Sequence, residues 1–235
     1  MTLFRYDAAI TARFPEVVGG IIVARGVVNG PTPRDLAAAY AAEQAATLAR
    51  LGDTPLSQVP SLAAWRGVFR GFGVDPTQYR SAAEALRRRL TKSGTIPSLN
   101  ALVDLGNMIS IRYALPIAVC DLRGARGTTT VRFAAGDERF TNLGQEEAEH
   151  PAPGEVIFSD PDGLVSARRW CWRQSAASAA REDTTGVLIT VEAQHAGGRA
   201  AVEAALRDLL ALLPTVEGSG VRTAILDRER PATPF

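Results

Sequence analysis

Glu192 is the residue of this chain whose type and position most directly suggest chemistry. It lies in the segment VLITVEA, residues 187–193, whose pattern predicts a mostly apolar strand with a carboxylate at its end. A carboxylate in such a place can pair with an ammonium group or accept a hydrogen bond from a phenol. The alternative is that Glu192 only ends a strand in solvent.

Aromatic and basic residues are concentrated in residues 168–173, RRWCWR. Alternation along a strand would put Trp170 and Trp172 on one face. Arg169 and Arg173 would then share the opposite face. The tryptophans could form a wall that stacks on an adenine or a side chain, with the guanidinium groups binding phosphate. Two core tryptophans beside arginines in ion pairs are the alternative.

Asn107 lies in residues 99–113, where the apolar spacing predicts a helix. Asn is a poor helix former, because its side chain competes for backbone hydrogen bonds. Its presence suggests a functional reason, such as binding a substrate or positioning a water molecule. The alternative is an exposed helical Asn or a packed helix end. Asn100, near the expected helix start, is in a favourable place for Asn.

Basic residues dominate residues 66–92, where Asp75 and Glu84 are the only acids. A solvated helix face is the usual meaning of such a run, and docking of a nucleic acid is the alternative. Consecutive arginines point around a helix, so they cannot form a single stripe. The candidate RNA-binding residues are Arg87, Arg88, Arg89, Lys92 and Arg169.

No catalytic triad or metal motif is recognisable in the sequence. The two histidines, His150 and His195, lie in turn-like segments without a Cys or His at ligand spacing, which predicts solvated loop residues. Cys120 and Cys171 lack a CxxC spacing, which predicts reduced thiols. We therefore expect no metal and no cofactor, and the catalytic residues stay unknown.

Residues 96–122, IPSLNALVDLGNMISIRYALPIAVCDL, resemble part of the B3/B4 module in the beta chain of bacterial phenylalanyl-tRNA synthetase. The module carries the pattern D-V-T-N-x-x-x-x-x-x-x-Q-P-x-H-A-F-D. The residues in register with it are Asp104, Asn107, Pro116 and Asp121. Residues 169–174, RWCWRQ, and motifs between residues 65 and 86 resemble freestanding B3/B4 proteins. The resemblance thus covers nearly the whole chain.

The resemblance implies an editing function. In the synthetase, this module hydrolyses the ester of tRNA charged with the wrong amino acid, and a Glu in a T-x-x-x-x-L-x-L-E-x-A context binds that amino acid. Carried over, Glu192 and Asn107 would hold the amino acid, and Trp170, Trp172 and Arg173 would line the pocket. The expected partner is mischarged tRNA or a free amino acid. A non-catalytic binding module and an RNA-binding accessory protein are the alternatives, and the chain is too short for a complete ligase.

Two positions depart from the family pattern. Ala118 occupies the place of the family's histidine, and Gly106 that of the threonine before the asparagine. Losing the histidine removes a group that could contact the ester or position a water molecule. This departure favours a binding module over a hydrolase. The sequence indicates neither a particular amino acid nor an oligomeric state.

Composition is that of an ordinary soluble globular protein. The 235 residues are 46% hydrophobic and 22% charged, and the net charge is +1. Such a charge gives no overall attraction to nucleic acid or to a membrane, so a basic surface must be local. No segment predicts a signal peptide or a spanning helix, so we expect a cytoplasmic protein.

The expected elements give an α+β fold, a β-sandwich of mixed strands flanked by helices. Helices are predicted near residues 33–51, 61–72, 82–92, 99–113 and 198–213. Strands are predicted within residues 14–28 and over 117–122, 128–134, 139–142, 155–159, 164–172, 186–193 and 222–227. We expect a single B3/B4-like domain, with a helical N-terminal part (1–95) and a pocket-forming α+β core (96–235).

Overall fold

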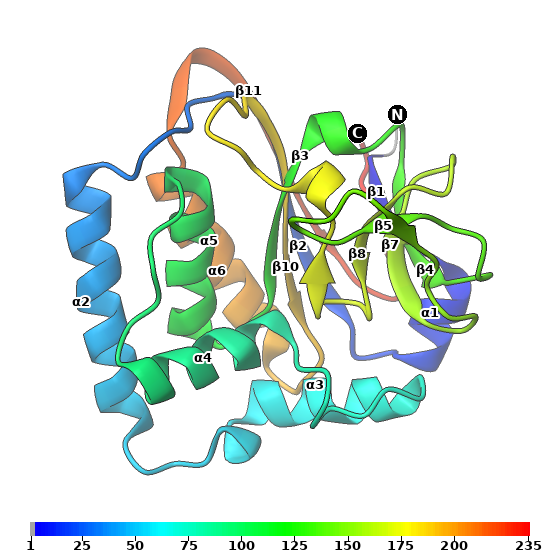
Figure 1. Ribbon diagram of the computed structural model, residues 1–235, viewed down its shortest axis with the longest axis horizontal. Helices are drawn as coiled ribbons and strands as arrows, with labels where there is room; N and C mark the ends of the chain where they lie inside the picture. Colours follow the sequence, from blue (N-terminus) through cyan, green and yellow to red (C-terminus); the bar gives the residue numbers. More distant parts are fainter. Residues whose placement is uncertain (1–2) are drawn as a thin grey trace.

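Two β-sheets face each other in the computed structural model, which describes residues 3–235 apart from the side chains of residues 217–219 (Figure 1). The first sheet has the order β1 (Phe4–Tyr6), β4 (Thr129–Phe133), β7 (Val156–Ser159), β8 (Val165–Arg168) and β9 (Arg173–Gln174). The second, antiparallel sheet has the order β11 (Thr215–Leu226), β2 (Val18–Val27), β10 (Gly186–Ala193) and β3 (Ile117–Asp121). A small ladder joins β5 (Phe140–Thr141) to β6 (Ala148–Glu149).

Helices cover the outer face of the second sheet. Two of them, α5 (Ala101–Tyr113) and α6 (Gly198–Leu212), pack against the strands, and α2 (Arg34–Leu51) packs on α5 (Figure 1). Helices α3 (Pro60–Gly71) and α4 (Ala82–Ser93) run along one edge of the molecule, and the short α1 (Ala8–Arg13) follows β1. The predicted fold class, a mixed sandwich flanked by helices, is confirmed.

β10 is a central strand and is buried on both faces. Its apolar and β-branched residues suit a pleated strand with neighbours on either side. Val187, Ile189 and Val191 belong to the core beneath the helices. Leu188 belongs to the core between the two sheets, and Thr190 and Glu192 follow it on the same face. Alternation therefore carries the Glu192 carboxylate into the sandwich.

The sequence SAAE at residues 81–84 predicts a capping box, and Gly94 predicts the end of that helix. Both predictions for α4, and the start of α5 near Asn100, are confirmed. Ser81 caps α4 by accepting a hydrogen bond from the Glu84 amide at 3.3 Å, and the helix ends at Gly94 with a left-handed φ of 71°. Asn100 caps α5 by accepting from the Val103 amide at 3.1 Å. These caps fix where α4 begins, beside the site described below.

Three expectations need correction. Residues 1–95 were expected to form a helical part, but β1 belongs to the first sheet and β2 to the second. The elements β1 and α1 were not predicted at all. The pattern TPRD at residues 32–35 predicts that Thr32 caps α2, but its hydroxyl donates instead to Asp104 at 2.6 Å. The strand predicted over 164–172 stops at Arg168, since Arg169 and Trp170 have left-handed φ angles of 44° and 59°.

Membrane-spanning character is not found in the part of the chain that the structure describes, where no helix combines the length and hydropathy needed to cross a bilayer.

Candidate functional site

A cavity of about 80 Å³ lies between the two sheets, where β10 ends and β3 begins. Ala118 and Thr190 line it from the second sheet, together with Glu192. Trp170 and Trp172 line it from the turn that follows β8. A carboxylate, a hydroxyl and aromatic rings thus line one partly open pocket.

The Glu192 carboxylate is buried, at 1% exposure, and accepts two hydrogen bonds on Oε1. The Tyr6 hydroxyl donates at 2.6 Å and the Trp170 indole nitrogen at 3.0 Å. Burial raises the pKa of Glu192 to about 7, because it disfavours the charged form more than the two donors favour it. Glu192 therefore does not end its strand in solvent, and it can change protonation state near neutral pH.

Tyr6 reaches Glu192 because residue 19 is glycine. Gly19 pairs with Glu192 across β2 and β10. A Cβ at Gly19 would lie 2.2 Å from the Tyr6 hydroxyl oxygen, which is far inside contact distance. Neither Tyr6 nor Gly19 was identified from the sequence. The Gly-Gly pair inside an otherwise β-rich run was the one available signal, since glycine within a strand often marks a close approach.

The two tryptophans do not share a face, contrary to the strand expectation. The left-handed turn at residues 169 and 170 buries Trp170 against Phe14 and Trp65, with ring centroids 5.2 and 5.3 Å apart. Trp172 is half-buried and stands edge-on to Tyr79, 5.0 Å between centroids. Trp170 is thus a core residue whose indole nitrogen reaches the cavity, and Trp172 lies at the cavity's rim.

Two guanidinium groups flank Trp172. The Cζ atoms of Arg169 and Arg173 lie 4.6 and 4.4 Å from its ring centroid, within the range of a cation–π contact. Burial lowers the pKa of Arg169, and Glu155 opposes that shift. Arg173 is exposed, lines the cavity and donates to Asn142 Oδ1 at 3.1 Å. The rim therefore carries positive charge on an aromatic surface.

The fold does not place the Asn107 side chain near Glu192. It lies on α5, on the opposite side of the second sheet, with its side chain beside the Tyr40 hydroxyl of α2. β3 turns Val119 toward α5, where a Cβ on Gly106 would lie 2.8 Å from it. Ala118 faces the cavity instead. A role for Asn107 in holding the same ligand as Glu192 does not fit this arrangement.

Arg87 is not available to RNA, which corrects the expectation for that residue. Its side chain is buried and donates to the Ile111 carbonyl at 2.6 Å. Desolvation lowers its pKa to about 10. The neighbouring residues Arg88, Arg89 and Lys92 are exposed on α4, so the basic surface is smaller than the sequence suggested.

Neither histidine lines the cavity. His150 is exposed in a loop, as predicted, with Nδ1 2.8 Å from the Glu138 carbonyl oxygen. His195 is half-buried, and burial lowers its pKa, so the prediction of a solvated loop residue is wrong for it. Ala118, at the position of the family's histidine, is the residue that contacts the cavity.

A buried carboxylate beside a pocket between two sheets is the main feature of this mixed α/β protein. The B3/4 domain family model matches residues 64–207, and the chain belongs to this family.

Similar proteins include beta subunits of phenylalanine–tRNA ligase. The chain is 34% identical over 106 residues, 45% of its length and 13% of the relative's, to that of Bradyrhizobium diazoefficiens. It is 29% identical over 98 residues, 42% of its length and 12% of the relative's, to that of Shewanella oneidensis. It thus spans a small part of each. An N-terminal fragment of the beta subunit from Pyrococcus horikoshii aligns over 94% of this chain and 50% of that fragment, with 14% identity and a TM-score of 0.47.

Proposed function

We propose that this protein hydrolyses the ester of mischarged aminoacyl-tRNA that carries a small amino acid. The observation that carries the proposal is the buried Glu192 carboxylate, whose pKa is about 7, lining a cavity with Arg173 at its rim. The relation to the ligase beta subunits supplies the tRNA context. The expected place of action is the cytoplasm, where charged tRNA is used.

Hydrolysis of such an ester requires few catalytic groups. Aminoacyl esters are already reactive, so hydrolysis needs a positioned water molecule and stabilisation of the developing oxyanion. Glu192 would pair with the α-ammonium group of the substrate or take a proton from the attacking water. Arg173 and the indole of Trp172 would contact the terminal nucleotide. Backbone groups of the cavity and the substrate's vicinal hydroxyl would hold the water.

The volume of the cavity limits the size of the amino acid that the pocket can accept. An engineered cavity of roughly 150 Å³ binds benzene, whereas the cavity beside Glu192 measures about 80 Å³. Tyr6 and Trp170 occupy the space on the Glu192 side. The pocket therefore suits a small aliphatic or hydroxylated amino acid better than an aromatic one.

Filling the cavity should slow hydrolysis strongly. Ala118→Leu would place extra carbons where the aminoacyl group is proposed to sit, and we expect deacylation to fall at least tenfold, measured on tRNAs mischarged with alanine, serine, tyrosine and phenylalanine. Ala200→Leu, at an exposed position of α6, is the matched control and should keep the wild-type rate. A wild-type protein that releases none of the four amino acids would contradict the hydrolase proposal.

A non-catalytic module that binds a small amino acid is the second candidate. Two observations favour it: Ala118 lines the cavity in place of a histidine, and Glu192 already has two donors. The same variants separate the candidates. Amino-acid binding in calorimetry that Ala118→Leu removes, without deacylation by the wild type, would identify the binding module.

The exposed basic residues of α4 offer a docking surface for tRNA. If Arg88, Arg89 and Lys92 contact phosphates, replacing all three with Gln should flatten the salt dependence of tRNA affinity, by roughly 0.7–0.9 in log–log slope for each lost contact. Filter binding between 50 and 200 mM salt measures this slope. Arg34→Gln with Arg228→Gln, both exposed elsewhere, is the control. An unchanged slope in the triple variant would exclude this surface.

A further inference from the structure

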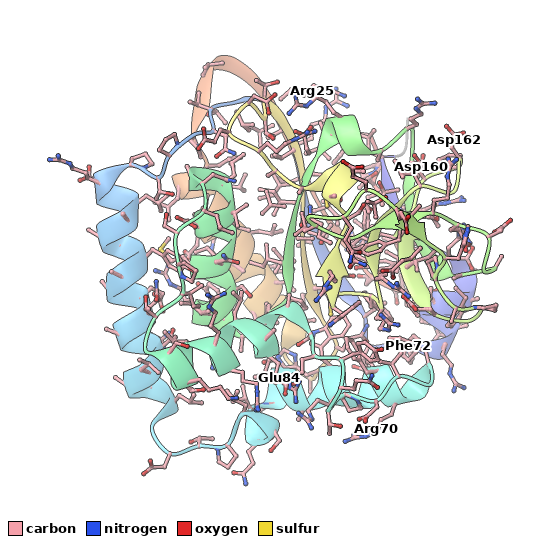
Figure 2. The ribbon with its side chains drawn as sticks, viewed as in Figure 1. Arg25, Arg70, Phe72, Glu84, Asp160 and Asp162 are labelled. Carbon is pink, nitrogen blue, oxygen red and sulfur yellow. The ribbon has the colours of Figure 1, made fainter. Side chains whose placement is uncertain are left out.

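A second and larger cavity, of about 340 Å³, opens at the other end of the space between the sheets. It begins where β3 ends and β10 starts, at Asp121 and Gly186, whereas the first cavity lies at the opposite ends of the same strands. Arg25, which lines the second cavity, lies near the top of Figure 2. The two cavities share no lining residue. The two cavities are thus separate sites.

Arg25 has an unusually open setting. Its cross-strand partners are Gly186 on β10 and Gly220 on β11. Because both partners lack a side chain, neither neighbouring strand covers the guanidinium group. Arg25 is exposed, and it forms no ion pair with the side chains that the structure describes. A guanidinium in this setting is free to bind a carboxylate or a phosphate with two parallel hydrogen bonds.

The charged side chains at the entrance of the second cavity favour the binding of an anion. An adjoining hollow of about 250 Å³ shares Arg25 and adds Arg222, whose Cζ lies 5.8 Å from the ring centroid of Phe235. Asp121, the carboxylate that lines the cavity, pairs with Arg123 at 2.6 Å, and Asp183 shares the same guanidinium at 2.9 Å, so this group of three keeps one negative charge. The exposed guanidinium groups of Arg25 and Arg222 add two positive charges to this one negative charge, so the entrance keeps a net positive charge.

The lining of the cavity combines apolar and polar surface in similar amounts. Val23, Cys120 and Leu188 of the core between the sheets line it, together with Leu3 and Leu122. The lining also includes the hydroxyl-bearing residues Thr129, Ser166 and Ser178. The volume falls within the range of roughly 300–1,000 Å³ that is usual for small-molecule pockets. Apolar side chains in a mixed lining, below a cationic entrance, fit a ligand that has an anionic group at one end and a short apolar part at the other.

We propose that this cavity is a second binding site, which takes a small amphipathic anion. A carboxylate or phosphate group would bind to Arg25, and a short apolar chain would lie over Val23 and Leu188. The site is independent of hydrolysis at Glu192, because it lies at the opposite end of the sandwich.

Isothermal titration calorimetry with three probes tests the site: octanoate, octyl phosphate and the neutral octanol. The wild type should bind the two anions at least tenfold more tightly than octanol, and the stronger of the two identifies the preferred head group. Arg25→Ala should weaken both anions at least tenfold and leave octanol unchanged. Arg34→Ala, at an exposed position outside the cavity, is the matched control.

Two further variants locate the binding. Thr185 is exposed and lines the cavity, so Thr185→Trp should block all three probes, with an unchanged circular dichroism spectrum showing that the fold is kept. Ala118→Leu, in the first cavity, should bind all three like the wild type. Anion binding that Arg25→Ala leaves intact, anion binding lost in Ala118→Leu, or no binding of octanoate or octyl phosphate at millimolar concentrations would overturn the proposal.

Discussion

Glu192→Gln is expected to remove a pH dependence of folding stability worth about 3 kcal/mol. The folded-state pKa of Glu192 is about 7, against 4.5 for an unperturbed Glu. The folded protein therefore favours the protonated carboxyl group. This contribution to stability is fully present below pH 4.5 and is lost as the pH rises through 7, at about 1.4 kcal/mol for each unit of pKa difference.

Urea denaturation at pH 5 and pH 8 measures this effect. The wild type should lose stability between these values, and the Gln variant should lose much less. Other titratable groups do not produce this difference in pH dependence between the wild type and the Gln variant. Asp121 and Glu138 have lowered pKa values, so they act below the range tested. His195, whose pKa is also lowered, adds stability as the pH rises and is present in both proteins. Equal pH dependence in the two proteins would show that Glu192 is charged across this range.

Gly19→Ala should destabilise the protein by about 3 kcal/mol or more. The added methyl group would lie 2.2 Å from the Tyr6 hydroxyl oxygen, so the tyrosine must move. Overpacking of this kind typically costs ~1–3 kcal/mol. Displacing Tyr6 also leaves Glu192 with the Trp170 donor alone, which adds the penalty for a weakened buried hydrogen bond, ~1–3 kcal/mol.

A double-mutant cycle assigns the cost to the Tyr6 hydroxyl. In a Tyr6→Phe background, the closest contact of the new methyl is the ring carbon at 3.0 Å, so Gly19→Ala should cost clearly less than in the wild type. Gly67→Ala is the control, because a Cβ at Gly67 in α3 meets nothing within 4 Å. That variant should be neutral or stabilising by ~0.5–1 kcal/mol. Equal costs of Gly19→Ala in both backgrounds would rule out the hydroxyl as the cause.

Local patterns explain what the sequence could predict. The capping box at Ser81 and Glu84 fixed the start of α4, because the hydrogen bond joins residues three apart. Alternation in β10 located Glu192 correctly at a strand end. Its partner Tyr6 could not be predicted in the same way. It lies 186 residues away, on a strand of three residues that is too short to leave a pattern.

Backbone conformation and tertiary packing account for the errors. The segment around Trp170 has the composition of a strand, but two left-handed residues turn it and send the two tryptophans to different places. Arg87 was grouped with its charged neighbours, whereas helix geometry turns it onto α5, where the Ile111 carbonyl accepts its hydrogen bond. Asn107 was placed in the pocket by a matched motif, and the β3 alternation puts it behind the sheet.

The position of β2 has a consequence for synthesis of the chain. β2 is apolar and central, and both of its neighbours, β10 and β11, come from residues 186–226. At ribosomal rates of about 5–20 residues per second, β2 stays unpaired for on the order of ten seconds before β10 and β11 have been synthesised. Such non-local pairing is intrinsically slow, and an unpaired apolar strand is prone to aggregate. The nascent chain is therefore expected to depend on chaperones while β2 stays unpaired.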